Sequence, residues 1–227
     1  EGKQEEVKNK KKRRTGRPNR KLGGKNSIRI LAINIGGSEK ELTEALQSQC
    51  HILLLQEHRR AAGTLATWQR KAAAAGWEGV WTEADTAKAG GVSGGVATLG
   101  RKGLSIGRCN VKNHSRMLKT YIQWTASTKF HVYNIYGYDG GLQGHADLNA
   151  ELTDKLERLI TEAGRIPWLC GGDWNQPPTE QKSQHLLKAR IHDHGAGTFQ
   201  GAERLDYFIA SAAWGPLLTS KVRGTLG

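Results

Sequence analysis

The stretch Pro167-Trp168-Leu169-Cys170-Gly171-Gly172-Asp173-Trp174-Asn175-Gln176-Pro177-Pro178 joins an apolar run to a polar pair bracketed by glycines and prolines. The apolar residues suit a buried strand, the two glycines let the backbone turn or approach a ligand, and the two prolines end the strand. Asp173 and Asn175 are therefore expected at the carboxyl edge of a strand, where open α/β sheets hold ligands. Their i, i+2 spacing points both side chains the same way if the backbone stays extended. The alternative is that both only stabilise a turn by bonding their own backbone.

The composition indicates a basic protein with a polyanionic partner. The chain has 227 residues, 37% of them hydrophobic, which is enough for one domain with a real core. Its net charge is +13, and an excess of Lys and Arg over Glu in residues 1–25 supplies eight of these charges. Nucleic acid is the expected partner, ahead of an anionic membrane surface. No apolar run approaches the length of a membrane span, so no membrane partner is expected.

Residues 1–26 are predicted to form a disordered basic arm. They carry almost no large apolar side chains, so burial cannot offset the entropy of ordering them. Within the arm, residues 10–14 (KKKRR) have the charge density of a nuclear-import or nucleic-acid-binding run, with a merely solvated linker as the alternative. Cys50, Cys109 and Cys170 lack the spacing of a disulfide framework or a zinc site, which fits a reducing compartment. We therefore expect an intracellular, nuclear protein.

From residue 27 onward the chain alternates predicted strands and helices. Apolar or alternating runs predict strands near 28–35, 52–55, 77–82, 94–99, 104–109, 117–125, 130–138 and 205–209. Helical spacing predicts helices near 38–50, 62–75, 148–163 and 180–189. The strands at 94–99 and 104–109 are expected to pair with each other, and residues 84–93 are expected to form a loop. This order of elements favours an α/β protein with mixed sheets over a purely parallel one.

Isolated polar residues end or interrupt five of the predicted apolar strands. A buried polar group without a partner costs about 1 to 3 kcal/mol, so five such strands suggest that these groups share partners or a ligand. Three converging carboxylates repel each other, and a hard divalent cation relieves that repulsion. Mg²⁺ suits such a site because it takes one or two carboxylates together with water and a substrate phosphate. The residues concerned are Asn34, Glu57, Tyr136, Asp173 with Asn175, and Asp206.

Six short motifs follow one another along nearly the whole ordered chain, from Ile28 to Ile209. They are AINIGG, LLLQEHR, SGGVATL, NIYGYDG, GGDWN and RLDYFIA. The series resembles the endonuclease/exonuclease/phosphatase superfamily of metal-dependent phosphoesterases, and within it the AP-endonuclease-like domains and the endonuclease domains of non-LTR retrotransposons. The resemblance implies a DNase I-like fold for residues 27–227, a four-layered α/β sandwich with two mixed β-sheets flanked by helices. Because the chain begins at Glu1 rather than Met, we expect it to be part of a longer chain. Within that chain we expect the domain to be monomeric.

The resemblance also implies how the metal and the attacking water are held. Glu57 would ligate Mg²⁺, or Mn²⁺ in its place, and Asn34 would help to organise that site. Asp173 would align or deprotonate the attacking water. Asp206 corresponds to an Asp that either orients the catalytic His of the family or lies near the metal. In-line hydrolysis of a phosphodiester requires such a placed nucleophile and such charge neutralisation.

For the substrate, the resemblance assigns the scissile phosphate to Asn175 and Tyr136, which would hold it and stabilise its developing charge. Arg59 and Arg60 follow the metal-ligating Glu and are candidates for contacts with the substrate backbone, with a solvated helix start as the alternative. Trp174 is a candidate for stacking on a base, although packing in the core is the favoured interpretation.

Two features depart from the family pattern. The Ser-Asp-His strand that usually closes the family's domain does not occur before Gly227. Its expected place is only a few residues further on, so we interpret the domain as truncated at this strand. In NIYGYDG, nucleases of the family often have Pro and Asn after the Tyr, whereas Asp139 adds negative charge near the phosphate.

The sequence therefore predicts a Mg²⁺-dependent phosphodiester hydrolase that acts as a DNA endonuclease. One alternative is an RNA-directed nuclease or deadenylase of the same fold. Another is a catalytically silent nucleic-acid-binding module, in which the absence of the His would be genuine.

Overall fold

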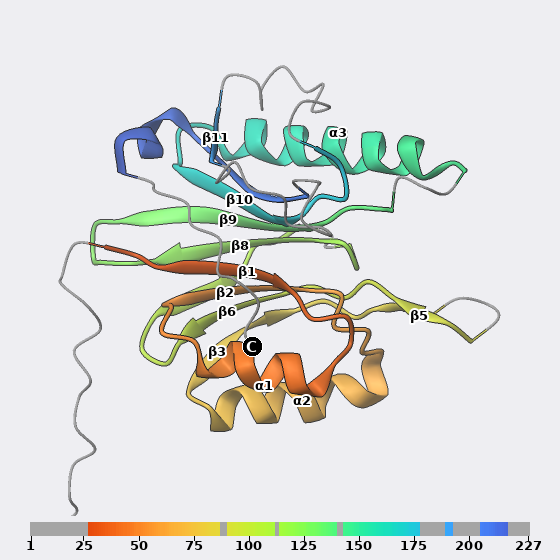
Figure 1. Ribbon diagram of the computed structural model, residues 1–227. Helices are drawn as coiled ribbons and strands as arrows, with labels where there is room; N and C mark the ends of the chain where they lie inside the picture. Colours follow the sequence, from red (N-terminus) through yellow and green to blue (C-terminus); the bar gives the residue numbers. More distant parts are fainter. Residues whose placement is uncertain are drawn as a thin grey trace, which may run out of the picture.

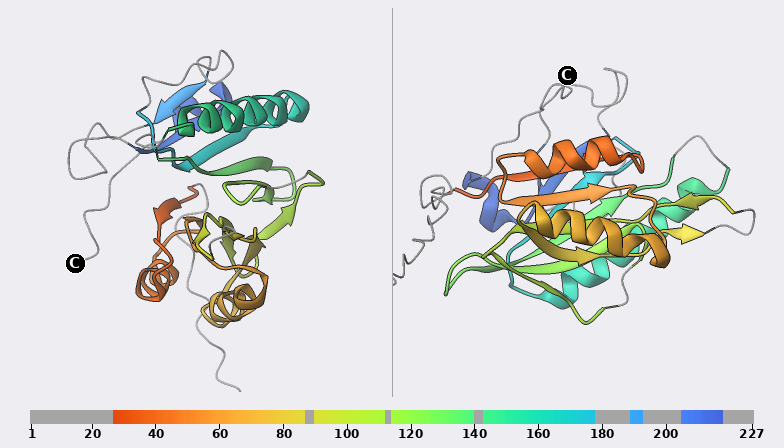
Figure 2. Two further views of the ribbon diagram at one scale, coloured as in Figure 1. Left: turned by 90° about the vertical axis from the view of Figure 1, so that its right-hand side faces the viewer. Right: turned by 90° about the horizontal axis from the view of Figure 1, so that it is seen from below.

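Two β-sheets face each other, and helices cover their outer faces. The computed structural model describes residues 27–86, 90–111, 114–139, 143–177, 189–192 and 205–217. Helices α1 (Glu39–Gln47) and α2 (Ala62–Ala74) cover one sheet, and α3 (His145–Ala163) covers the other (Figure 1). Seen from below, α1 and α2 lie side by side across their sheet (Figure 2). This arrangement confirms the predicted four-layered α/β sandwich.

Both sheets are mixed, as the sequence predicts. The first sheet consists, in spatial order, of β1 (Ile30–Asn34), β2 (Ile52–Gln56), β6 (Ala97–Arg101) and β3 (Trp77–Trp81). The second consists of β11 (Arg190–His192), β12 (Asp206–Ala210), β10 (Trp168–Asp173), β9 (Lys129–Tyr136), β8 (Met117–Gln123) and β7 (Ser105–Arg108). Among the described strands, β1 with β2 and β10 with β9 are the pairs that run parallel.

Helix α1 begins at the position that the sequence predicts. The Ser38 hydroxyl caps the helix by accepting a hydrogen bond from the amide N–H of Glu41 at 3.2 Å. The buried face of the helix packs against the first sheet and consists of Leu42, Ala45 and Leu46. Helix α3 likewise buries the predicted apolar stripe against the second sheet, through Leu152, Leu156, Leu159 and Ile160.

Strand β2 is buried on both faces, which explains its uninterrupted apolar run. Leu53 and Leu55 pack into the core beneath α1 and α2. Ile52 and Leu54 point the other way and pack between the two sheets, against residues of the second sheet that include Phe130 and Val132. Successive side chains of β2 therefore point alternately into the core beneath the helices and into the core between the sheets.

A buried polar contact between the sheets was not predicted. Gln56 Nε2 donates to Asn134 Oδ1 at 2.6 Å, so the end of β2 is bonded to β9. Asn134 Nδ2 in turn donates to the main-chain oxygens of Leu55 at 3.0 Å and Ala97 at 2.8 Å. Both side chains are fully buried. Asn134 thus connects one strand of the second sheet to two strands of the first.

The prediction that residues 94–99 pair with residues 104–109 is wrong. Strand β6 lies in the first sheet between β2 and β3, so both of its edges are occupied. After the turn at Lys102, whose amide donates to Gly76 O at 2.9 Å, the chain crosses to the second sheet and forms the outer strand β7. Sequence spacing of the two runs is compatible with a hairpin, but the edge that a hairpin needs is already taken.

Three other expectations concern segments outside regular sheets or outside the described residues. The loop expected at 84–93 contains a small ribbon of β4 (Asp85–Thr86) and β5 (Val92–Ser93). After β12, the chain forms the 3₁₀ helix η2 (Ala212–Leu217). The basic arm at 1–26 and the helix expected at 180–189 fall outside the described residues, except for Ala189. In the part of the chain that the structure describes, no helix is long and apolar enough to cross a membrane.

Replacing Asn134 by Leu is expected to lower the free energy of unfolding by about 2 to 4 kcal/mol, because two buried carbonyls and the Gln56 amide each lose one hydrogen bond. Urea unfolding followed by tryptophan fluorescence measures the loss. The control is Gln123→Leu, which removes an amide that bonds only an exposed turn. Equal stability of the two variants would show that the buried contact between the sheets contributes nothing.

Candidate functional site

The polar residues predicted at strand ends come together at one end of the sandwich. Asp173 ends β10 in register with Tyr136 of β9 on one side and Asp206 of β12 on the other. Cross-strand partners present their side chains on the same face, so these three lie on one surface of the second sheet. Asn34 ends β1 in the facing sheet, and Glu57 directly follows β2. This end lies at the right in Figure 1.

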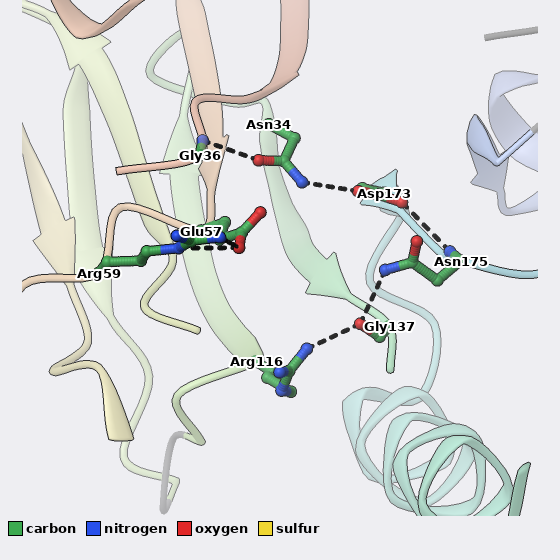
Figure 3. Close-up of polar contacts among 8 residues, drawn as sticks. All are labelled: Asn34, Gly36, Glu57, Arg59, Arg116, Gly137, Asp173 and Asn175. Carbon is green, nitrogen blue, oxygen red and sulfur yellow. Dashed lines mark hydrogen bonds and ion pairs between the residues drawn. The ribbon is translucent and has the colours of Figure 1, made fainter. Parts of the chain in front are cut away.

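A hydrogen bond between the two sheets forms the centre of the site. Asn34 Nδ2 donates to Asp173 Oδ2 at 2.8 Å, across 139 positions of the chain (Figure 3). Asn34 Oδ1 accepts from the amide of Gly36 at 2.9 Å, which fixes the orientation of the side-chain amide. Asn34 therefore presents its NH₂ group to the carboxylate of Asp173.

Asp173 is a buried carboxylate with an unusual proton affinity. Burial, followed by repulsion from Asp206 and then Glu57, raises its pKa to about 6, against the opposing hydrogen bonds from Asn34 and Asn175. The residue is only 8% exposed. A carboxylate with a pKa near neutrality can both hold and release a proton in the physiological range, which is what a general base requires.

Asn175 departs from the extended conformation on which the sequence argument relied. Its φ is +49°, in the left-handed region. Its amide donates to Asp173 Oδ1 at 3.2 Å, which is the local turn contact considered as the alternative to a site. Its side-chain Nδ2 donates to Gly137 O at 3.0 Å (Figure 3). The turn and the site are thus the same structure, because the turn brings the Asn175 amide beside Asp173.

Glu57 and Arg59 lie in the loop after β2, and both adopt left-handed backbone conformations, with φ of +55° and +52°. Within the described residues, only Asn175 among the other non-glycine residues has a positive φ. The loop is held by hydrogen bonds from the amide of His58 to Gly95 O at 3.1 Å and from the amide of Arg59 to Gly94 O at 3.0 Å. Arg59 forms an ion pair with Glu57.

Arg116 is a site residue that the sequence analysis missed. Its guanidinium lies 4.4 Å from the ring centroid of Tyr136 and 4.2 Å from that of Tyr138. Its Nη1 donates to Gly137 O at 2.8 Å, the same oxygen that accepts from Asn175. Burial and the nearby carboxylate of Glu57 raise the pKa of Tyr136, so its hydroxyl stays protonated. The only sequence signal was a basic residue directly before a predicted strand.

Two candidates for substrate contact are instead held within the protein. Arg60 Nη2 donates to Gly37 O at 2.8 Å, and its guanidinium lies 4.2 Å from the ring centroid of Trp68. Trp174 is buried, stacks on Tyr207 with ring centroids 5.0 Å apart, and donates from Nε1 to Tyr207 O at 3.1 Å. These contacts agree with core packing, the favoured interpretation of Trp174.

The chemistry of these side chains fits a hard divalent cation. In the described residues, no three His, Cys, Asp or Glu side chains form a ready-made metal cage. Mg²⁺ does not need one, because it binds through one or two carboxylates and completes its shell with water and phosphate. Glu57 is paired with a cationic side chain, and burial, with added repulsion from Asp206 and Glu57, raises the pKa of Asp173. Both facts indicate negative charge that a cation would neutralise.

Comparisons with known proteins give a family and a fold. The model of the Endonuclease/Exonuclease/phosphatase family matches residues 31–226. The endonuclease domain of TRAS1, a telomere-specific non-LTR retrotransposon, matches with a TM-score of 0.58 and 16% identity over 84% of this chain and 88% of that one. No curated protein matches the chain.

Two further solved structures resemble the chain. The 3′ phosphatase NExo from Neisseria, bound to a product DNA hairpin, has a TM-score of 0.58 and 16% identity over 86% of this chain and 90% of its own. The AP endonuclease LMAP from Leishmania major has a TM-score of 0.57 and 15% identity over 82% and 79%. At such identities the likeness shows the fold, which is the predicted DNase I-like one.

Replacing Asn34 by Ala is expected to raise the pKa of Asp173 above its value of about 6, because the carboxylate loses a donor that stabilises its charged form. A carbon-13 NMR titration of the carboxyl groups in the metal-free protein measures the shift. The control is Asn149→Ala, which removes a side-chain amide bonded to the main chain of Tyr138 instead. An unchanged or lower pKa in Asn34→Ala would contradict the geometry.

Proposed function

The chain belongs to the endonuclease/exonuclease/phosphatase family, and from this premise we propose that it is a Mg²⁺-dependent phosphodiester hydrolase that cuts DNA as an endonuclease. One observation carries the proposal: the buried carboxylate of Asp173, with a pKa of about 6, is bonded to Asn34 and Asn175 and lies in register with Tyr136. A base is thus placed beside neutral donors, the combination that hydrolysis of an anionic ester requires.

Asp173 takes the proton of the attacking water in this mechanism. The Asn34 amide holds one carboxylate oxygen of Asp173 and the Asn175 main-chain amide holds the other, so the base cannot rotate away from the water. The hydroxyl of Tyr136 is protonated because its pKa is raised, and it donates to a phosphate oxygen. The Asn175 side chain has one N–H committed to Gly137 O, and its second N–H is available to the phosphate.

Glu57 would hold the metal, and Asn34 would help to organise that site. A bound Mg²⁺ supplies charge neutralisation at the phosphate and the leaving oxygen. Asp206, whose charge raises the pKa of its cross-strand neighbour Asp173, adds to the negative field that favours a cation at this end of the sandwich. Mn²⁺ accepts the same oxygen ligands as Mg²⁺ and is the expected substitute.

DNA is the proposed substrate because the chain is strongly basic and because it is similar in fold to proteins that act on DNA. The net charge of +13 favours a polyanion, and the affinity of the chain for DNA should fall as salt rises, through counterion release. A structural neighbour of this fold, NExo, was solved with a DNA hairpin, and the TRAS1 domain is described as an endonuclease. RNA is the principal alternative substrate, and a cleavage assay distinguishes RNA from DNA.

Glu57→Gln and Asp173→Asn are each expected to lower the rate of Mg²⁺-dependent nicking of supercoiled plasmid by about a hundredfold or more, because one removes a metal ligand and the other removes the base. The assay is run with the 227-residue chain and with the longest form that its gene encodes, on intact and abasic plasmid, with Mg²⁺ or EDTA. Glu44→Gln, a change at a partly exposed side chain of α1, is the matched control and is expected to retain the full rate.

Each outcome of this assay bears on the proposal. Nicking that depends on Mg²⁺ and is lost in both site variants supports it. Cleavage of a single-stranded RNA with plasmid left intact would replace DNA by RNA as the substrate. If every form of the protein binds DNA without cleaving it, the proposal that the protein is an enzyme is overturned. That result would favour a catalytically silent nucleic-acid-binding module.

A further inference from the structure

The ion pair between Glu57 and Arg59 involves the residue that is proposed to hold the metal. Arg59 Nε donates to Glu57 Oε1 at 2.9 Å, and Nη2 donates to the same oxygen. Both donors therefore form hydrogen bonds with the same carboxylate oxygen. The second oxygen of Glu57 points away from the guanidinium (Figure 3). The carboxylate is thus neutralised on one side by a cation that belongs to the protein.

The backbone of the loop builds this ion pair. Glu57 and Arg59 both have positive φ, which turns two side chains at i and i+2 toward each other. The amide of Gly37 donates to Glu57 O at 2.7 Å, and the Arg59 amide donates to Gly94 O at 3.0 Å. The Arg59 stem lies against Gly37, where an added Cβ would come within 3.0 Å of Arg59 Cδ. Contacts on both sides thus hold Arg59 in place.

The two side chains of the pair differ in their exposure to solvent. The side chain of Glu57 is only 14% exposed, although that of Arg59 is 49% exposed. A partly buried carboxylate is screened less by water and salt than an exposed one. A divalent cation at Glu57 would meet the positive guanidinium within the same few ångströms and would compete with it for Oε1.

We infer that Arg59 is a resident counter-ion of Glu57 that competes with the divalent cation, so that it sets the metal concentration at which the site fills. The inference rests on the proposed function, because it takes Glu57 as the metal ligand. Arg59 neutralises the partly buried carboxylate of Glu57. A metal bound at Oε1 would require the guanidinium to give up its hydrogen bonds to that oxygen.

The test measures Mn²⁺ binding to the purified chain by the electron paramagnetic resonance signal of free Mn²⁺, without substrate. Arg59→Met keeps the aliphatic stem and removes the charge, and it is expected to bind Mn²⁺ about three- to thirtyfold more tightly than the wild type. Arg59→Lys keeps the charge and is expected to stay within about threefold of the wild type. Lys40→Met is the matched control, because it removes one charge and a Lys–Glu contact of 3.8 Å on α1.

Glu57→Gln distinguishes failure of this inference from failure of the proposed function. Suppose that Glu57→Gln weakens Mn²⁺ binding, whereas Arg59→Met binds Mn²⁺ no more tightly than the wild type. Glu57 then remains the ligand, and the inference that Arg59 competes with the metal is refuted. If Glu57→Gln binds Mn²⁺ as well as the wild type, Glu57 is not a ligand, and both proposals about it fall together. Thermal unfolding of each variant without metal shows whether the fold is intact. Tighter binding in Arg59→Met together with lost binding in Glu57→Gln supports the inference.

Discussion

The hydrogen bond from Asn34 to Asp173 joins the two sheets at the point where the candidate chemistry lies. Each of these residues ends a strand, and the strands belong to different sheets. Face-to-face packing of the sheets brings the strand ends together, and the amide then satisfies a carboxylate that would otherwise be buried at a cost of a few kcal/mol. The same bond holds Asp173 in one orientation. One contact thus links the packing of the two sheets to the placement of the proposed base.

Backbone conformation explains the rest of the arrangement. Glu57, Arg59 and Asn175 adopt left-handed conformations that cost a non-glycine residue about 1 kcal/mol or more each. Main-chain oxygens of Gly94 and Gly95 hold the loop that carries the first two, and Gly137 O holds Asn175. Such cost at three positions of one site, in the described part of the chain, is typical of residues placed for a function.

Charge at this end of the sandwich is balanced over a short distance. Asp173, Asp206 and Glu57 bring negative charge into a partly buried region, and burial together with repulsion from the other two carboxylates raises the pKa of Asp173. Two arginines lie near this negative charge and make different contacts. Arg59 pairs directly with a carboxylate, whereas Arg116 lies on the rings of Tyr136 and Tyr138 and donates to Gly137 O. Gly137 O accepts from Arg116 and from Asn175, so one main-chain oxygen supports both the arginine that lies on the Tyr136 ring and the Asn175 side chain.

Local chemistry in the sequence by itself determined the layers of this protein and most of its candidate site. Apolar runs and helical spacing depend on neighbouring residues, so β2, α1 and α3 were predictable, and the repeated polar residue at strand ends identified Asn34, Glu57, Asp173 and Asp206. Only the tertiary structure decided that β7 joins the second sheet, that Asn134 bonds Gln56, that Trp174 is buried, and that Arg59 and Arg116 face the site. The physical reason is that these outcomes depend on which sheet edge is free and which partner lies across the interface, and residues far apart in the chain set both.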